Sequence, residues 1–465
     1  MTTDTIAAQS TARGTAAIAV LRLSGPDAIT ILERHFHPPG RISRLPSHQC
    51  AVGAFHDGGE AIDQVVVTLF RAPNSYTGED LIEIGAHGGD WTPGRILKSL
   101  WTSGARPARP GEFTERAFLN GKIDLAQAEA VEALVRARSG AAARAALRIL
   151  SGGLKGALVE SMERLTGALA GIEAGLDIQQ DGAPDAIAPQ QVDGREILRA
   201  ERERLQSLLQ GGHAGKLMEE GARVVLTGRP NAGKSSILNA FLARARALVS
   251  PIPGTTRDAI EAWVEWEGVP VVLVDTAGLS PSERPDDHGG DPLANESRGR
   301  TLEALASATL VVQVVDAHAT CPEDLVRDIE RMSVPSDRIL VALHKWDLGP
   351  CSAWNNALQA EAGMVRSSVV EAPGVEPLRR AIARRLKAAG DEAEAALLVG
   401  ERQRMEIGTA QQALLRALEH LDRGGCEELA AFELRSALDH LGEILGLRVG
   451  PLLLERIFST FCVGK

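Results

Sequence analysis

Hydrophobic and polar residues alternate with different spacings in different parts of this 465-residue chain. Up to about residue 120, short β-like runs at 18–23, 65–70 and 81–84 are separated by Gly and Pro, which predicts a small α+β domain. From residue 147 to 176, apolar residues recur every three or four positions. That spacing places them on one face and predicts a single long helix packed against other helices.

A third spacing begins near Arg223, after a second helical stretch at 196–209. Apolar runs at 224–226, 271–274, 310–315 and 339–343 alternate there with helical segments. This alternation is typical of a doubly wound, mainly parallel sheet.

Helical spacing returns after about residue 388, so helical segments flank the α/β block on both sides. The economical arrangement is an α/β domain inserted into a helical domain, whose helices then share one core. We predict an N-terminal α+β domain at 1–120, a helical domain at 121–217 plus 388–465, and an inserted α/β domain at 218–387.

Composition narrows the possible partners and compartment. The 61 acidic residues outnumber the 50 Lys and Arg, which argues against a surface that coats nucleic acid with uniform positive charge. No apolar run approaches the roughly 18–20 residues needed to cross a bilayer, and the N-terminus lacks the basic start of a secretory signal. The five cysteines show no CxxC spacing, which suits a reducing compartment. We predict a cytoplasmic protein without a membrane segment.

One segment carries a phosphate-binding pattern. Gly228, Gly233, Lys234 and Ser235 stand in G-x-x-x-x-G-K-S register, between a strand-like and a helix-like run. Glycines let backbone N–H groups turn toward phosphates, the Lys supplies a point charge, and the Ser hydroxyl is a ligand for Mg²⁺.

Further nucleotide-site candidates follow downstream. Thr256 is a second candidate Mg²⁺ ligand, in a loop that closes when a γ-phosphate is present. The run 275–278 (DTAG) follows an apolar strand, where its carboxylate is placed to hold Mg²⁺ through water, although this sequence alone is also a common β-turn. Asp347 is placed to recognise guanine, or alternatively to cap a helix. The predicted GTP-binding residues are Asn231, Ala232, Gly233, Lys234, Ser235, Ser236, Thr255, Thr256, Asp275, Thr276, Ala277, Gly278, Lys345, Asp347 and Ser368.

Together with the terminal FCVGK (461–465), these motifs resemble the MnmE (TrmE) family of tRNA-modification GTPases. The resemblance covers nearly the whole chain and includes DTIA (4–7), LRLSGP (21–26), PNSYTGEDLIEIGAHGG (73–89) and RPGEFTERAFLNGKIDLAQAEAV (109–131). It implies a P-loop GTPase domain inserted in the helical domain, and an N-terminal domain that binds a tetrahydrofolate derivative (5-formyl- or methylene-tetrahydrofolate).

The resemblance also implies partners and a reaction. Family members act with the FAD-dependent protein MnmG, in an expected heterotetramer, to modify C5 of the wobble uridine in certain tRNAs. The expected homodimer forms through the N-terminal domain. Arg22, Glu83, Lys122 and Lys465 match the folate-contacting positions, and Cys462 matches a cysteine required for modification. Without the family, the first three would be ordinary surface ion-pairing groups and Cys462 a small buried hydrophobe.

Hydrolysis needs a substitute for a missing residue, because Leu279 stands where many GTPases have a water-orienting Gln. The resemblance implies that a K⁺ ion beside the phosphates supplies the charge, and that the G domains dimerise around it. Its expected ligands are Asn231, Ser250, Ile252 and Thr255. The expected catalytic Glu, which positions the attacking water, is Glu296, with Glu283 as the alternative if the alignment slips.

Three departures from the family pattern keep other functions open. His344 replaces an Asn, Val369 replaces an Ala, and the loop 10–16 lacks the family's Pro-Pro-Gly-Arg-Gly-Gly character. The leading hypothesis is a K⁺-activated GTPase that gates wobble-uridine modification. The alternatives are a GTP-dependent RNA-assembly switch and a catalytically drifted scaffold.

Overall fold

The chain forms two compact units in a computed structural model. The model describes residues 4–180, 194–244, 261–275, 303–332, 334–351, 354, 363–371, 373–395, 400–423 and 426–465. The first unit comprises Met1–Glu132, Ile149–Glu203 and Met405–Lys465, and the second comprises Ala133–Arg148 and Arg204–Arg404. The predicted domain boundaries at residues 120, 217 and 387 stay predictions.

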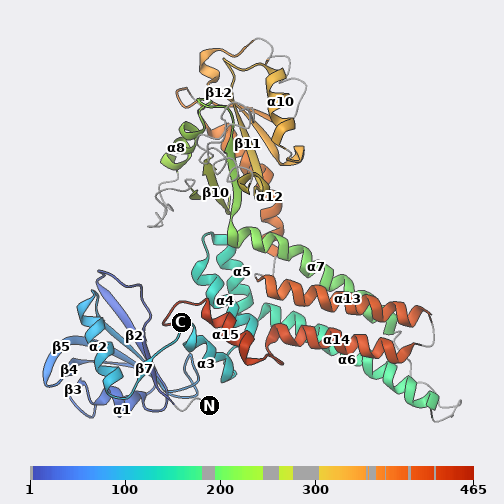
Figure 1. Cartoon of the computed structure of the whole chain (residues 1–465). Helices are drawn as coiled ribbons and strands as arrows, with labels where there is room; N and C mark the ends of the chain where they lie inside the picture. The colour runs from blue at the N-terminus through green and yellow to red at the C-terminus, as the bar shows by residue number, and fades with distance from the viewer. Residues whose placement is uncertain are drawn as a thin grey trace, which may run out of the picture. The chain divides into compact units, whose positions relative to one another are not determined.

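In the first unit, the N-terminal segment folds around a sheet (Figure 1). The strand order is β3 (Phe36–His37), β4 (Gln49–Asp57), β5 (Glu60–Phe70), β6 (Leu81–His87), β2 (Ile18–Ser24), β1 (Ile6–Gln9) and β7 (Arg106–Pro107). Neighbouring strands are antiparallel except β1 and β7, which are parallel. The predicted α+β character of this segment is confirmed.

Helices α1 (Ala28–Glu33) and α2 (Trp91–Thr102) supply the apolar side chains that pack on this sheet. Alternation along β5 buries Val65, Val67 and Leu69 in that core, because successive side chains of a strand point to opposite faces. Val66 points the other way and is 47% exposed.

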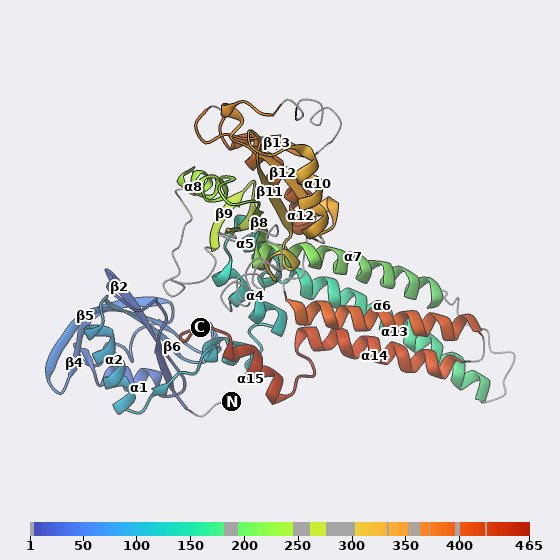
Figure 2. The same cartoon turned by 45° about the horizontal axis from the view of Figure 1, so that its top comes forward.

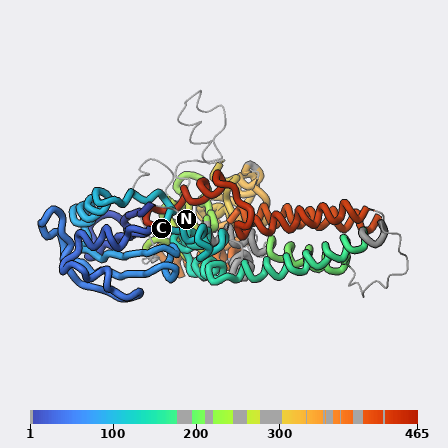
Figure 3. Tube along the Cα trace, turned by 90° about the horizontal axis from the view of Figure 1, so that it is seen from below, coloured from blue at the N-terminus to red at the C-terminus, as the bar shows by residue number. Residues whose placement is uncertain are grey.

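The rest of the first unit is helical. It contains α3 (Glu112–Leu119), α4 (Leu125–Arg136), α6 (Gly153–Gln180), α7 (Gly194–Glu220), α13 (Glu401–Arg423), α14 (Glu427–Leu445) and α15 (Pro451–Ser459), of which α4, α7 and α13 continue across the boundary between the units. The helix α14 lies alongside α6, although the whole α/β segment separates them in sequence (Figure 3). The sequence predicted that helices before and after the inserted segment would pack together in one core.

The prediction of one continuous helix over 147–176 is wrong. Helix α5 (Gly140–Leu150) ends, and α6 starts at Gly153 after a turn. Gly152 adopts φ +91° in that turn, a left-handed conformation that glycine adopts at little cost and that interrupts a right-handed helix. Apolar spacing continued through the turn, so periodicity alone did not reveal it.

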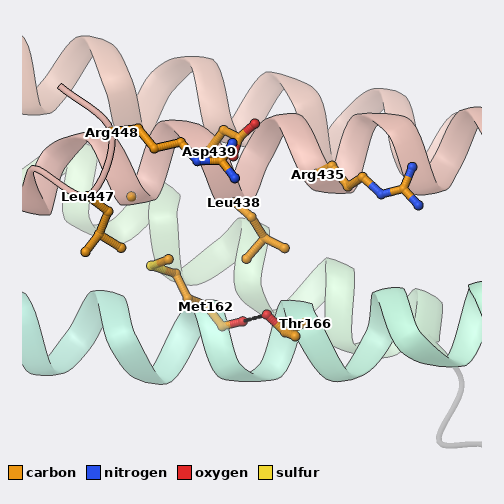
Figure 4. A pocket seen from close by; sticks show the side chains of 8 residues that line it. Met162, Thr166, Arg435, Leu438, Asp439, Leu447 and Arg448 are labelled. Atoms are coloured by element: carbon orange, nitrogen blue, oxygen red, sulfur yellow. Dashed lines mark hydrogen bonds and ion pairs between the residues drawn. The ribbon is translucent and has the colours of Figure 1, made fainter. Parts of the chain in front are cut away.

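A pocket of about 360 Å³ lies between α6 and α14 (Figure 4). Met162 and Thr166 line it from α6, and the Thr166 hydroxyl donates to the main-chain oxygen of Met162 at 2.7 Å. From the other side it is lined by Arg435, Leu438, Asp439, Gly442, Leu447 and Arg448. The two helices therefore pack closely along only part of their length.

The second unit is built on a sheet with the strand order β13 (Met364–Arg366), β12 (Ile339–His344), β11 (Leu310–Asp316), β8 (Ala222–Thr227), β10 (Val269–Asp275) and β9 (Glu261–Trp266). All neighbouring pairs are parallel except β10 and β9. Two short 3₁₀ helices, η1 (Ser336–Arg338) and η2 (Trp346–Leu348), flank β12.

Helices cover both faces of this second sheet (Figure 2). Side chains of α8 (Lys234–Arg244) and α12 (Glu376–Ala395) pack on one face, and those of α10 (Pro322–Met332) pack on the other. Val224 and Leu226 lie in the first core and Val225 in the second, which is why the strands read as continuous apolar runs. The predicted doubly wound, mainly parallel sheet is confirmed.

Residues 133–148, which the sequence analysis placed in the helical domain, join this second unit. The Arg138 guanidinium lies 4.1 Å from the centroid of the Trp263 ring on β9, and the Gly140 N–H donates to Glu265 at 3.4 Å. Ala141 is buried in the same core as α8.

Among the described helices, none is both long and apolar enough to cross a membrane.

Replacing Gly446 with Ala tests the turn that follows α14. Gly446 has φ +83°, and an added Cβ would lie 2.6 Å from Cε2 of Phe118 and 3.0 Å from Cβ of Leu125. We expect Gly446→Ala to lower the free energy of unfolding by about 2–4 kcal/mol, through backbone strain and overpacking, as measured by denaturant titration. The control is Gly408→Ala inside α13, where an added Cβ meets nothing within 4 Å and we expect no loss. Equal stability of the two variants would contradict the assignment of strain to Gly446.

Candidate functional site

The P-loop lies between the end of β8 and the start of α8, as the sequence predicted. Gly228 has φ +143°, and an added Cβ would lie 2.2 Å from the main-chain oxygen of Val314 on β11. Asn231 and Gly233 also have positive φ, at +63° and +102°. The loop therefore needs glycine at two points, first to pass the neighbouring strand and then to enter the helix.

The Lys234 side chain folds back over this loop. Its ammonium donates to the main-chain oxygens of Gly228 at 2.9 Å and Arg229 at 3.2 Å. Burial lowers the pKa of Lys234, and the nearby Asp275 carboxylate opposes that shift. A buried cation in a loop of this kind is placed to meet an anionic ligand.

Ser235 and Asp275 meet at the first turn of α8. The Ser235 hydroxyl donates to Oδ2 of Asp275 at 2.8 Å, and the carboxylate is 3% exposed at the end of β10. Its other oxygen, Oδ1, is buried and accepts no hydrogen bond from any described residue. A buried carboxylate oxygen without a donor beside a hydroxyl fits the hard-oxygen ligand set of Mg²⁺.

The base-recognition candidates lie together after β12. The Ser368 hydroxyl donates to Oδ1 of Asp347 at 2.6 Å, and accepts from the N–H groups of Val370 and Glu371, each at 3.1 Å. Lys345 has φ +56°, and its ammonium pairs with Asp316 at 2.7 Å. These contacts orient the carboxylate of Asp347 within the loop.

His344, which the sequence analysis treated as a departure, connects the base loop to the P-loop. The ring is buried and shares a hydrogen bond of 3.0 Å between Nδ1 and the Ser367 hydroxyl. A Cβ added to Gly233 would lie 2.3 Å from Cδ2 of this ring, so the ring occupies the space that a side chain would fill. Burial lowers the pKa of His344, which keeps the ring neutral at pH 7.

Several predicted site residues lie outside the described residues: Ser250, Ile252, Thr255, Thr256, Thr276, Ala277, Gly278 and Glu296, together with the alternative Glu283. Their roles stay predictions.

A second site forms where the C-terminal tail meets the N-terminal sheet (Figure 1). Val463 bridges to Pro110, and the Phe113 N–H at the start of α3 donates to the main-chain oxygen of Lys465 at 3.1 Å. Gly464 has φ +94°, and an added Cβ would lie 2.4 Å from the main-chain oxygen of Gln9. Glycine at this position lets the tail approach β1 closely.

The tail brings four predicted residues together. Arg22 and Glu83 are paired across β2 and β6, with Nε of Arg22 3.0 Å from Oε1 of Glu83. Arg22 also donates to the main-chain oxygen of Gly464 at 3.4 Å. Burial and then the Arg22 charge lower the pKa of Lys465, whereas Cys462 and Glu83 oppose the shift. The Lys465 N–H also donates to the main-chain oxygen of Cys462 at 3.3 Å, so the tail turn that carries both residues lies beside the Arg22–Glu83 pair.

Lys122 lies at a neighbouring loop instead, where its ammonium donates to the main-chain oxygen of Pro73 at 2.9 Å. Sequence reasoning missed Tyr76, whose ring centroid is 5.5 Å from the Arg22 guanidinium and whose hydroxyl bonds to Thr114 at 2.9 Å. Burial raises the pKa of Tyr76. The available signal was that this is the only Tyr in the chain, inside the segment 73–89.

A doubly wound sheet with this P-loop, the Ser235–Asp275 pair and the Asp347 loop defines a P-loop nucleotide-binding protein of the GTPase class. Models of the GTP-binding protein TrmE N-terminus and the MnmE helical domain match residues 5–122 and 125–462. The chain belongs to the MnmE family of tRNA modification GTPases, and is therefore a GTP hydrolase.

Named relatives match the chain from end to end. The tRNA modification GTPase MnmE of Symbiobacterium thermophilum is 42% identical over 99% of both chains. The MnmE proteins of Moorella thermoacetica and Akkermansia muciniphila are 39% and 40% identical, over 100% and 99% of both chains. Among solved structures, the G domain of the T. maritima FeoB iron transporter is 23% identical and covers 35% of this chain and 98% of its own, with a TM-score of 0.26.

Replacing Asp347 with Asn tests the base-recognition loop. A carboxylate accepts hydrogen bonds from the guanine N1–H and amino group, whereas an amide also donates and suits the 2-oxo group of xanthine. We expect Asp347→Asn to weaken GTP binding at least tenfold and to favour xanthosine triphosphate, as measured by competition with a fluorescent nucleotide. Asp337→Asn, in the exposed 3₁₀ helix before β12, is the control. Unchanged guanine selectivity would remove Asp347 from base recognition.

Proposed function

We propose that this chain is a K⁺-activated GTPase that works with an MnmG-like, FAD-dependent protein to modify C5 of the wobble uridine of certain tRNAs. The product carries a carboxymethylaminomethyl-type group, and its one-carbon unit comes from a tetrahydrofolate derivative. GTP hydrolysis and G-domain dimerisation gate the reaction. One observation carries the proposal: this chain combines a GTPase site with a second polar site, which is formed by Arg22, Glu83, Cys462 and Lys465.

The second site has the chemistry to bind a folate. Arg22 and Lys465 offer cationic donors for the carboxylates of the ligand tail, and Glu83 offers an acceptor for pterin N–H groups. The half-buried Tyr76 ring beside Arg22 adds a flat apolar surface. In this proposal the bound folate supplies the one-carbon unit, while Arg22, Glu83 and Lys465 orient it beside the Cys462 thiol. Lys122, which the family resemblance also matches to a folate-contacting position, contacts the same ligand from its own loop.

The nucleotide site has the ligands for the proposed cations. Ser235 and Thr256 would hold Mg²⁺ directly. Asp275, whose buried Oδ1 accepts no hydrogen bond from the described residues, would hold it through water. Asn231, Ser250, Ile252 and Thr255 would hold K⁺, which supplies positive charge beside the phosphates in place of an arginine finger. Glu296 would position the attacking water.

An exposed apolar surface on the N-terminal sheet supports the proposed homodimer. Val52 and Val66 face each other across β4 and β5 and are 53% and 47% exposed. Ile18, at the start of β2 in the same sheet, is 64% exposed. Exposed apolar groups gathered on one sheet are typical of an interface between subunits.

We place the protein in the cytoplasm, where an acidic chain meets tRNA through local contacts or through its partner.

Comparing GTP hydrolysis in K⁺ and Na⁺ buffers tests the proposed GTPase mechanism. We expect K⁺ to raise the steady-state rate at least tenfold over Na⁺ with GTP, because the proposed K⁺ ion supplies positive charge beside the phosphates, and to have no such effect with ATP. Asn231→Ala should abolish the K⁺ stimulation while GDP binding persists. Slow turnover that is equal in K⁺ and Na⁺ would contradict the cation-assisted mechanism.

Replacing Cys462 with Ser separates hydrolysis from modification. The thiol lies in the first unit, with its neighbours on the N-terminal domain, whereas the P-loop lies in the second. We expect Cys462→Ser to keep GTP hydrolysis within about twofold and to abolish wobble-uridine modification, read by nucleoside mass analysis after reconstitution with the MnmG-like protein. Cys426→Ser, at the start of α14, is the matched control. Normal modification by Cys462→Ser would exclude the thiol from the reaction.

A further inference from the structure

Two loops of the GTPase sheet lie against each other beside the base-recognition residues. One follows β11 and the other follows β12, and these parallel strands are neighbours with Asp316 opposite His344. Polar contacts between described residues join the loops. Lys345 pairs with Asp316 at 2.7 Å, and His318 bonds to the main-chain oxygen of Gly349 at 2.9 Å. The Cys351 N–H donates to the main-chain oxygen of Ala317 at 2.9 Å, and the Trp354 ring N–H donates to the main-chain oxygen of Thr320 at 2.8 Å.

The same contact brings two thiols together. The sulfur atoms of Cys321 and Cys351 are 3.8 Å apart, although 30 residues separate them in sequence. Cys321 is exposed directly before α10, and Cys351 is partly buried. Neither thiol is used by the proposed GTPase or modification chemistry.

The geometry favours a bond between them. A disulfide needs its sulfurs about 2.05 Å apart and its two backbones close together. The backbone hydrogen bond from Cys351 to Ala317 already holds the loops in contact. Because the Cys321 side chain is exposed, rotation about its own bonds can move its sulfur toward Cys351 at little steric cost.

We propose that Cys321 and Cys351 are a modification site, which a low-molecular-weight disulfide oxidises to an intramolecular disulfide that tightens guanine-nucleotide binding. One protein thiolate attacks the small disulfide and releases one small thiol. The second protein thiol, losing its proton, then displaces the other small thiol as the protein S–S bond forms. Two protein thiols are oxidised and one small disulfide is reduced to two thiols.

The effect on nucleotide binding follows from the position of Cys351, four residues after Asp347. The bond would fix the loop that carries Asp347 in the conformation where Ser368 already contacts its carboxylate. A loop ordered in advance loses less entropy when the base binds, so GDP should leave more slowly. This step rests on the proposed base-recognition role of Asp347, whereas formation of the bond does not.

Neighbouring groups set the pH dependence of the reaction. The contact with Cys351, followed by smaller contributions that include Glu323 and Asp324, raises the pKa of Cys321. Because the thiolate is the attacking form, we expect faster oxidation as the pH rises above neutrality.

The test treats the reduced full-length protein with oxidised glutathione and measures two quantities. Mass spectrometry of the digested protein identifies which cysteines are joined, and stopped-flow displacement measures the dissociation rate of a fluorescent GDP. We expect a Cys321–Cys351 link and two- to tenfold slower GDP dissociation, reversed by dithiothreitol. Cys321→Ser and Cys351→Ser should each lose both effects, whereas the control Cys50→Ser, whose thiol lies on β4, should keep them.

Each other outcome overturns a defined part of the proposal. If the two cysteines are not linked, or only carry glutathione, the disulfide is refuted. If the link forms and GDP dissociation is unchanged or faster, the coupling to nucleotide binding is refuted. If the reduced protein binds no guanine nucleotide, the proposed function fails, and the mass measurement still decides whether the bond forms.

Discussion

The packing of α14 against α6 is the contact on which the helical part of the first unit depends, because it joins helices from both sides of the inserted segment. The two helices lie on opposite sides of the inserted α/β segment, yet Arg435 of α14 pairs with Glu173 of α6 at 2.5 Å, and Gly442 lies beside Met162. Their shared core cannot close until the chain has passed through the whole insertion. This long loop has an entropic cost that grows only slowly with its length, so a large inserted domain is tolerated.

This packing also determines where the C-terminal tail can reach. Gly446 ends α14 and turns the chain toward α15, where Phe458 and Phe461 pack on Leu125 and Ala128. From α15, only a few residues remain to bring Lys465 to Arg22. The cluster of Arg22, Glu83, Cys462 and Lys465 is therefore a product of tertiary packing between distant segments, although every member lies in a recognisable motif.

The sequence predicted those features that depend on local pattern. Strands buried on both faces read as apolar runs, and the P-loop register fixed Lys234 and Ser235 between strand and helix. The break at Gly152 was missed because apolar spacing continues across it. The contacts of Arg138 with Trp263 and of Gly140 with Glu265 were not predicted, because they are made by tertiary packing. The contact of Tyr76 with Arg22 and the proximity of Cys321 to Cys351 likewise come from segments that meet only in the fold.

His344 stands where the family pattern has an Asn, and its ring contacts both the segment after β13 and the P-loop. The residue at the end of β12 must join the base loop to the P-loop, and a neutral imidazole does this by bonding Ser367 while its ring fills the space beside Gly233. A protonated ring there would place an unpaired charge in a buried position, which burial disfavours. The lowered pKa of His344 is thus a consequence of the burial of its ring between Ser367 and Gly233.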